Sequence, residues 1–304
     1  MTTYGLTPRE SVDLLTVWVS RLAEDAKTRA LVIKGPLMAV QGLRTPRDSG
    51  DVDVWVDPAE VEQYVALLET HGWTRLLNDR PSILPVHART MRHERWGCEL
   101  DVHDRFPGFF ADRGVVFEHL WDLRTTERLA GADVLTAART GNAAVLALHL
   151  LRDLRPGRPA EELNHLADVV RGFSDDERRT IAELAAACGA NETLAPFLES
   201  TGLEPVAGAT ASTRDLEDWR LLTQTHGAPT VYWVHRFTRT PWRRRPALVW
   251  RAFWMTDAQI RDEMPHVGSS RGAMLAARLR RLRRGFARLP GAVRLVLKSR
   301  SGRD

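Results

Sequence analysis

The pattern of hydrophobic and polar residues predicts that strands and helices alternate in the front third of the chain. A capping box at Thr7, with a proline at the first helical position, precedes apolar residues at helical spacing and predicts a helix of about four turns. The apolar run 31–33 predicts a buried strand, a second strand follows at 51–56, and Asp57 caps a helix that ends near Gly72. This alternation is typical of α/β folds.

The pattern changes twice further along the chain. Three strands are predicted next, over residues 73–77, about 84–92 and 96–103. After about Leu120 we expect the strands largely to stop. Helices are predicted there over residues 141–154, 160–173 and 174–189, and the last begins with a second capping box at Ser174. Residues 202–213 are rich in Gly, Ala, Thr and Ser, which predicts a loop before a further, Trp-rich region.

Charge is distributed unevenly along the chain. From Arg271 to the end there are 11 Lys and Arg residues and one acidic residue, so the chain has an acidic body and a basic tail. The tail carries one apolar seam at spacings of four and three residues, formed by Leu275, Leu279, Leu282, Phe286 and Leu289. We expect this seam to pack on the chain's own body or on a partner, and binding to a membrane surface or to nucleic acid is the alternative.

Composition excludes several classes of protein. No basic and apolar leader begins the sequence and no uninterrupted run of about 18 apolar residues occurs, so we expect a cytoplasmic protein without a membrane span. The two cysteines, Cys98 and Cys188, are too few and too isolated for a disulfide framework or a zinc ribbon. We interpret both as structural or incidental.

The candidate chemistry begins at the second predicted strand. Because side chains alternate along a strand, Asp51 and Asp53 share one face while Val52, Val54 and Val56 face a core. Two carboxylates about 6–7 Å apart repel each other, and no Lys or Arg lies within the strand to relieve them. A hard divalent cation would relieve them, and Mg²⁺ held by carboxylates and substrate phosphates is typical of phosphoryl or nucleotidyl transfer. Alternatively, the strand simply ends in solvated acids.

A later strand adds a third acidic position. Glu99, Asp101 and His103 share one face of the predicted strand, and Leu100 and Val102 share the other. Because its second face is apolar, this strand can lie in the same sheet as the first acidic pair.

These residues together resemble the nucleotidyltransferases of the DNA polymerase beta superfamily. Within it, Lys34-Gly35, Arg47, Asp51-Val52-Asp53 and the stretch 100–103 are similar to the uncharacterised nucleotidyltransferase family proteins, and the resemblance covers roughly residues 30–170. It implies a small mixed-sheet domain, a mostly helical domain and a basic helical tail, in short an α/β (α+β) fold. The implied domains are residues 1–125, 126–200 and 201–304.

The resemblance also implies an activity. Nucleotidyl transfer would move a nucleoside monophosphate, AMP from ATP, to a small-molecule or peptide acceptor with two Mg²⁺ ions. Asp51 and Asp53 would hold both ions and Asp101 the one that activates the acceptor hydroxyl. The nucleotide would contact Lys34, Gly35, Arg47 and His103. Members of the group often occur near genes for modified-peptide natural products, which implies a place in natural-product biosynthesis.

The sequence departs from the family at one position and leaves several roles open. Pro36 follows Gly35 where the superfamily has a serine, so phosphate contact would fall to backbone N–H groups and to Lys34. Lys34 either contacts phosphate or is a surface residue at a strand end, and Arg47 is either a phosphate clamp or a partner for Asp48. His103 orients Asp101, contacts the substrate or only packs against its neighbours. Further alternatives are Glu99 as a metal ligand, and hydrogen bonding within the helical region by His149, His165 and Asp168.

Two other functions are compatible with the sequence. One is a catalytically weak or inactive relative that binds a nucleotide or a partner protein, which the missing serine favours. The other is a protein whose basic tail binds nucleic acid or a membrane surface. Nucleic acid is not an expected partner, because the tail has few aromatic residues to stack bases and the body is acidic.

Overall fold

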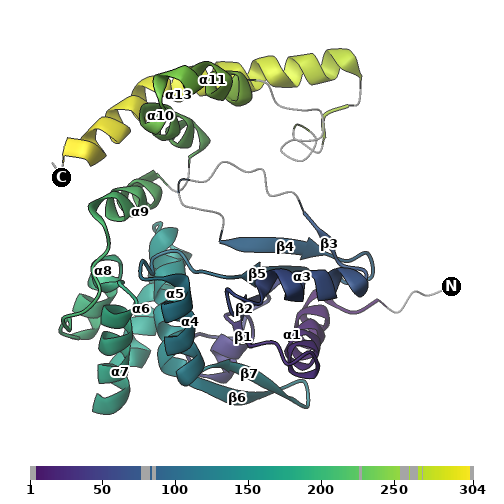
Figure 1. The fold of residues 1–304 in the computed structure, drawn as a ribbon, viewed down its shortest axis with the longest axis vertical. Helices are drawn as coiled ribbons and strands as arrows, with labels where there is room; N and C mark the ends of the chain where they lie inside the picture. The colour runs from purple at the N-terminus through teal and green to yellow at the C-terminus, as the bar shows by residue number, and fades with distance from the viewer. Residues whose placement is uncertain are drawn as a thin grey trace. The chain divides into compact units, whose positions relative to one another are not determined.

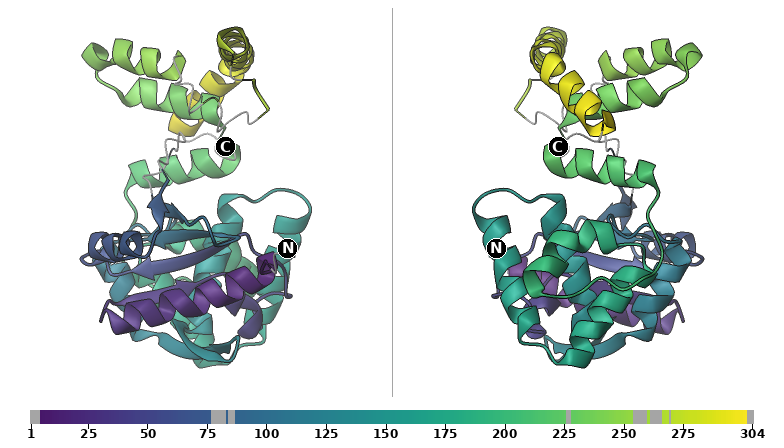
Figure 2. Two further views of the ribbon diagram at one scale, coloured as in Figure 1. Left: turned by 90° about the vertical axis from the view of Figure 1, so that its right-hand side faces the viewer. Right: turned by 90° about the vertical axis from the view of Figure 1, so that its left-hand side faces the viewer.

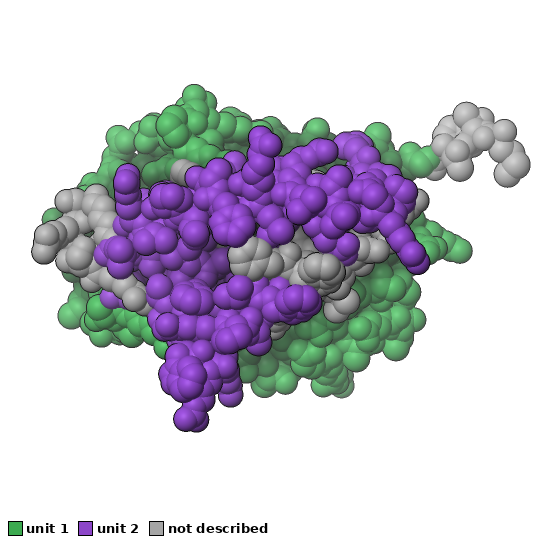
Figure 3. All heavy atoms as spheres, turned by 90° about the horizontal axis from the view of Figure 1, so that it is seen from above, with its two compact units in different colours: residues 1–78, 86–216 green, residues 79–85, 217–304 purple. Residues whose placement is uncertain are grey.

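In the computed structural model the chain folds into two compact units. The described residues are 5–76, 83, 87–225, 228–253, 260, 266–268 and 270–301. One unit comprises residues 1–78 and 86–216 and the other residues 79–85 and 217–304, as coloured in Figure 3. The three-domain division at residues 125 and 200 stays a prediction.

One mixed β-sheet forms the centre of the first unit (Figure 1). Its strands among the described residues are β1 (Ala30–Ile33), β2 (Asp51–Val56), β3 (Thr74–Arg75), β4 (Ala88–Arg92), β5 (Glu99–His103), β6 (Arg124–Leu129) and β7 (Ala132–Ala137), in the order β3-β4-β5-β2-β1-β7-β6. β2 pairs in parallel with β5 and antiparallel with β1. The predicted mixed α/β fold is confirmed, while residues 77 and 84–86 of the predicted strands lie outside the described residues.

Helices cover both faces of this sheet. They are α1 (Pro8–Asp25), α2 (Leu37–Val40), α3 (Val61–Thr70), α4 (Arg113–Asp122), α5 (Arg139–Arg152), α6 (Arg158–Arg171), α7 (Asp175–Ala187) and α8 (Asn191–Thr201). The next helix, α9 (Thr213–Thr225), begins at the end of the first unit and belongs mostly to the second. Both predicted capping boxes are present: the Thr7 and Ser174 hydroxyls accept backbone N–H groups, and Glu10 and Glu177 accept in return. The helices α1 and α7 therefore begin where the sequence indicates.

The two faces of the sheet differ in chemistry. On one face Val52, Val54 and Val56 pack in a core with side chains of α1 and α3, as predicted. Figure 2 shows α1 across this face and α5 to α8 on the other side of the sheet. On the second face Trp55 is fully buried, with its ring 5.9 Å from that of Phe106. Polar residues of β2 and β5 therefore lie between the sheet and the α5 to α8 layer.

The expectation that strands largely stop after Leu120 is wrong. β6 and β7 form an antiparallel hairpin whose turn places Ala130 and Gly131 at positive φ, of 47° and 77°. β7 pairs in parallel with β1, and the Thr136 hydroxyl donates to the Val32 carbonyl over 2.6 Å. The hydrophobic pattern fails here because β6 is an edge strand whose exposed positions are charged or polar, so it buries little apolar surface.

The second unit is helical, as predicted for the C-terminal region. It contains α10 (Pro229–Arg239), the short 3₁₀ helix η1 (Trp242–Arg244), α11 (Arg245–Phe253) and α13 (Arg271–Ser301). α10 packs on α13 through a small core that includes Leu221, Val231, Ala292 and Val296. The predicted seam does not supply that core. Among the described residues, no helix combines the length and the apolar character needed to cross a bilayer.

Candidate active site

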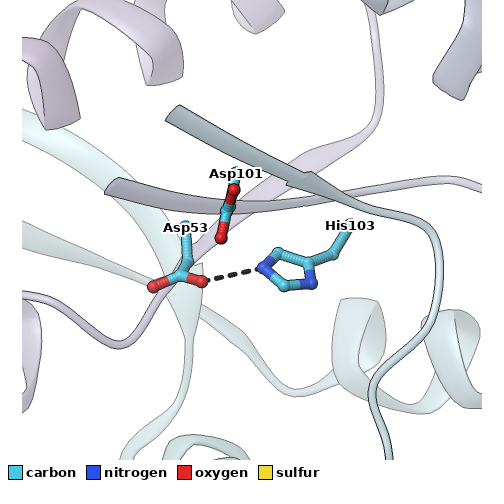
Figure 4. A group of neighbouring side chains, drawn as sticks. All are labelled: Asp53, Asp101 and His103. Atoms are coloured by element: carbon cyan, nitrogen blue, oxygen red, sulfur yellow. Dashed lines mark hydrogen bonds and ion pairs between the residues drawn. The ribbon is translucent and has the colours of Figure 1, made fainter. Parts of the chain in front are cut away.

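The register between β2 and β5 brings two of the three predicted acidic residues, Asp53 and Asp101, together, while Asp51 pairs with Glu99. Asp53 stands opposite Asp101 and Trp55 opposite His103, and residues paired in this way point to the same face of a sheet. Figure 4 shows Asp53, Asp101 and His103 converging from the two strands. One potential ligand atom of each lies within 4.8 Å of the others, so these three residues form a group that could hold a metal ion.

Asp53 is the most buried acid of this group. Its Oδ1 atom contacts Lys34 Nζ at 2.5 Å and His103 Nε2 at 2.8 Å. Burial alone would raise the pKa of Asp53, but the Lys34 ammonium and the His103 imidazole outweigh it and hold that pKa well below its ordinary value. No Lys or Arg of β2 offsets the repulsion between the Asp51 and Asp53 carboxylates. The cation that does so is Lys34, which directly follows β1.

Lys34 reaches this position because the chain turns sharply after β1. Lys34 has a φ of 58° and Gly35 a φ of 55°, so two successive residues occupy the left-handed region. This conformation costs little for glycine but strains lysine. A Cβ atom placed on Gly35 would meet no atom within 4 Å, so space is open above the turn.

The other acids are held less tightly. The Thr90 hydroxyl donates to Asp101 Oδ1 over 2.6 Å, and the Ser49 hydroxyl donates to Asp51 Oδ1 over 3.1 Å. Burial and then the charge of Asp53 raise the pKa of Asp51 above its ordinary value. The Asp51 and Asp101 carboxylates are half-buried, which leaves them accessible to solvent. Glu99 is half-buried as well and forms an ion pair with Arg92 at 2.5 Å.

His149 was expected to hydrogen-bond within the helical region and does so with Arg152 of the same helix, but the pattern of the sequence missed Arg152 and His87. Arg152 Nη1 lies 3.3 Å from His87 Nε2, and its Nη2 lies 3.5 Å from His149 Nδ1. Burial lowers the pKa of His87 to about 2 and that of His149 to about 3, so both imidazoles are neutral acceptors. The His87 ring also stacks on His103, with centroids 5.7 Å apart. Arg152 thus adds a half-buried cation near the acidic group.

The other two residues that were expected to hydrogen-bond within the helical region lie on α6. Asp168 does so with Arg171, one turn further along the same helix, and His165 is exposed. Neither residue belongs to the group around Asp53.

A basic pocket adjoins the turn after β1. Its volume is about 260 Å³, and Gly35, Pro36, Arg44, Arg47 and Ser49 are among its lining residues. The buried Arg44 donates from Nη2 to the Gly35 carbonyl over 2.9 Å, and burial, followed by the charge of Arg47, lowers its pKa to about 10. Arg47 pairs with Glu162 of α6 at 2.6 Å. The predicted nucleotide contacts Gly35 and Arg47 therefore line one pocket beside Lys34.

The donor set fits a hard divalent cation. Carboxylate oxygens are the ligands that Mg²⁺ prefers, and Asp53 and Asp101 supply them on adjacent strands. His103 Nε2 is already bonded to Asp53, so it orients that carboxylate. Asp51 lies two residues from Asp53 on the same face of β2 and adds a further carboxylate at the start of the strand.

Comparison with solved structures finds weak matches. A lincosamide antibiotic adenylyltransferase bound to lincomycin shares 15% identity, with 57% of this chain and 95% of that chain covered and a TM-score of 0.31. An antigenic nucleotidyltransferase-like protein from Paracoccidioides brasiliensis shares 12%, with 62% and 93% covered and a TM-score of 0.35. A tRNA nucleotidyltransferase complexed with a primer tRNA and an incoming ATP analogue shares 13%, with 92% and 94% covered and a TM-score of 0.26.

A search of curated proteins finds no match. The family described as uncharacterised nucleotidyltransferase matches residues 15–201, which is more than half of the 304 residues. The chain therefore belongs to this nucleotidyltransferase family.

Proposed function

We propose that the protein transfers a nucleoside monophosphate, AMP from ATP, to a hydroxyl of a small-molecule or peptide acceptor, with two Mg²⁺ ions. The observation that carries the proposal is the placement of Asp53 and Asp101 side by side on parallel strands, next to Lys34 and the basic pocket. This reaction requires the carboxylates that bind metal and the cationic side chains that bind phosphate to lie close enough for one nucleotide to reach both.

In this proposal the acids have separate roles. Asp51 and Asp53 hold both ions, and Asp101 holds the one nearer the acceptor. When bound, the ions stabilise the charge that grows on the α-phosphate and on the leaving pyrophosphate. The Thr90 hydroxyl bonded to Asp101 and the His103 ring bonded to Asp53 fix the two carboxylates, which limits the reorganisation needed during the reaction.

The phosphates would lie on the β1 side of the acids. Lys34 supplies a point charge, backbone N–H groups near Gly35 supply donors, and Arg47 supplies a guanidinium at the pocket wall. Pro36 has neither a hydroxyl nor an N–H group to offer, so these three residues would carry the phosphate contacts. His103 is hydrogen-bonded to Asp53, so it would affect the nucleotide indirectly, by orienting the Asp53 carboxylate.

The finer parts of the proposal rest on the family resemblance. It favours ATP as the donor, a small molecule or peptide as the acceptor, a cytoplasmic setting and a place in natural-product biosynthesis. The pocket by the turn is lined by arginines and apolar residues, which suits the phosphates of any nucleotide equally.

The test uses nucleoside triphosphates labelled at the α-phosphate, Mg²⁺ and a cell extract as the source of acceptor. We expect wild type to transfer label from one nucleotide, and Asp101→Asn to lose transfer by orders of magnitude. Asp133→Asn, which alters an exposed acid on β7, should behave as wild type.

Thermal unfolding separates binding from chemistry in the same variants. Mg²⁺ with the donor nucleotide at a hundred times its dissociation constant should stabilise wild type by about 2.7 kcal/mol. Stabilisation without transfer would favour the second candidate, a catalytically weak nucleotide-binding protein. Absence of any shift with every Mg²⁺–nucleotide pair would remove the enzyme proposal.

A further inference from the structure

The long helix α13 presents an apolar stripe to solvent. Six of its exposed apolar residues, Leu275, Leu279, Phe286, Leu289, Val293 and Leu297, have 37–58% of their surface accessible, and a seventh, Leu295, projects from another side of the helix. At about 100° per residue the six positions fall within a stripe about 80° wide. The buried contacts of the helix come from another set of positions, Met274, Ala277, Ala292 and Val296. The helix therefore packs within its unit on one side and leaves four of the five residues of the predicted seam exposed on another, while Leu282 is half-buried.

The charge of this helix has one sign. Residues 271–301 contain ten Lys and Arg residues and no Asp or Glu. Arg278, Arg283 and Arg294 fall within about 60° of the two edges of the apolar stripe when projected down the helix axis. The stripe is thus bordered by positive charge, which is the arrangement of helices that lie in the headgroup region of a bilayer.

Exposed aromatic side chains occur in the same unit. Trp242 and Trp250 have 71% and 63% of their surface accessible, and together with Phe237 and Val249 they line an open apolar concavity. Large exposed apolar patches on a folded unit indicate an interaction surface. Tryptophan in particular is enriched where protein meets the membrane–water interface.

We propose that the second unit binds the surface of a bilayer containing anionic lipid, with the stripe of α13 embedded among the headgroups. A second copy of the chain is a poor occupant, because pairing two such helices would bring ten positive charges against ten. Nucleic acid would match the charge but would leave the leucines exposed, since its affinity comes from phosphate contacts and base stacking. Anionic lipid satisfies both the charge and the apolar stripe.

The test is flotation of the full chain with vesicles of phosphatidylcholine alone or with phosphatidylserine added. We expect binding to the anionic vesicles to be at least about tenfold tighter and to weaken as salt is raised. The double variant Leu279→Glu with Phe286→Glu should lose at least about tenfold in affinity, because both side chains leave the apolar phase. Both positions are more than half exposed, so the fold should persist, which circular dichroism checks.

Leu14→Glu serves as the matched control, since Leu14 is an exposed leucine on α1 in the first unit and its change should leave vesicle binding unaltered. Three results would overturn the proposal. One is equal or absent binding to the two kinds of vesicle, and another is unchanged binding of the double variant. The third is that wild type is a dimer and the double variant a monomer, which would mean that a second copy of the chain covers the stripe.

Discussion

Replacing Lys34 by methionine should show that this lysine is the counter-ion of Asp53 in the metal-free protein. The change keeps the length of the side chain and removes its charge. Lys34 Nζ lies 2.5 Å from Asp53 Oδ1, and both side chains are largely shielded from solvent, with 12% and 4% of their surfaces accessible. After the substitution a buried carboxylate would depend on His103 alone.

The size of the effect follows from the burial of the pair. Two unit charges about 4 Å apart attract each other by about 4 kcal/mol at an effective dielectric constant of about 20. Removal of one partner from a buried pair costs about 3–5 kcal/mol, since the remaining charge is left uncompensated. We therefore expect Lys34→Met to lower the free energy of unfolding at pH 7 by about 3–5 kcal/mol. Asp53→Asn should also destabilise the metal-free protein, because it leaves the ammonium buried without a partner.

Denaturant unfolding with and without Mg²⁺ measures both parts of the argument. Mg²⁺ alone should stabilise Lys34→Met more than wild type, because the ion can neutralise the carboxylate that the ammonium no longer contacts. The double variant Lys34→Met with Asp53→Asn should have a higher free energy of unfolding than the sum of the two single changes predicts. Lys34→Arg keeps the charge and should lower the free energy of unfolding less than Lys34→Met does. A cost below about 1 kcal/mol for Lys34→Met, or equal stabilisation of variant and wild type by Mg²⁺, would refute the reasoning.

Three smaller predictions follow from other contacts. Burial lowers the pKa of His87 and His149 in the folded protein far below the value of about 6.5 in the unfolded chain, so the free energy of unfolding should be greatest above that pH and fall as the pH drops below it. The expected slope is about 1.4 kcal/mol per pH unit for each histidine. In unfolding measured from pH 7 to 4.5, His87→Gln should remove the slope that His87 contributes. Arg47→Ala should raise KM for the nucleotide with a smaller effect on kcat, whereas Arg158→Ala, which removes another arginine from the same glutamate, should leave both unchanged in steady-state assays. Tyr64→Phe removes a buried hydroxyl that donates to a main-chain carbonyl of α1 over 2.9 Å and should cost about 1 kcal/mol in denaturant unfolding.

The acidic face could be predicted from the sequence because it depends on local periodicity. Alternation along a strand fixes which side chains share a face, so Asp51 and Asp53 were placed opposite Val52 and Val54 without knowledge of the fold. The pairing of β2 with β5 needed one further step, which the shared pattern of apolar and acidic positions supplied. Helix starts at capping boxes were predictable for the same reason, since the signal lies within four residues.

Contacts across the sheet could not be predicted in this way. Arg152 lies on a helix whose pattern is that of a buried amphipathic element, and nothing in its spacing indicates contact with His87, 65 positions away in the chain. The hairpin of β6 and β7 was missed because the residue at its turn, Ala130, is not one that usually takes a positive φ. For the tail, the sequence predicted the apolar seam correctly, but whether a seam is buried depends on what else packs against the helix.

The pairing of Lys34 with Asp53 has a consequence for how substrates would bind. If Asp53 holds a metal ion and Lys34 holds phosphate, each ligand draws one member of the pair away from the other. Metal binding alone would leave the ammonium near a cation, and nucleotide binding alone would leave the carboxylate buried without its partner, so each separate event carries a penalty. Bound together, the ion takes the place of the ammonium at Asp53 and the phosphates take the place of the carboxylate at Lys34. Metal and nucleotide should therefore bind with positive coupling, and by linkage each should raise the affinity of the other by the same factor.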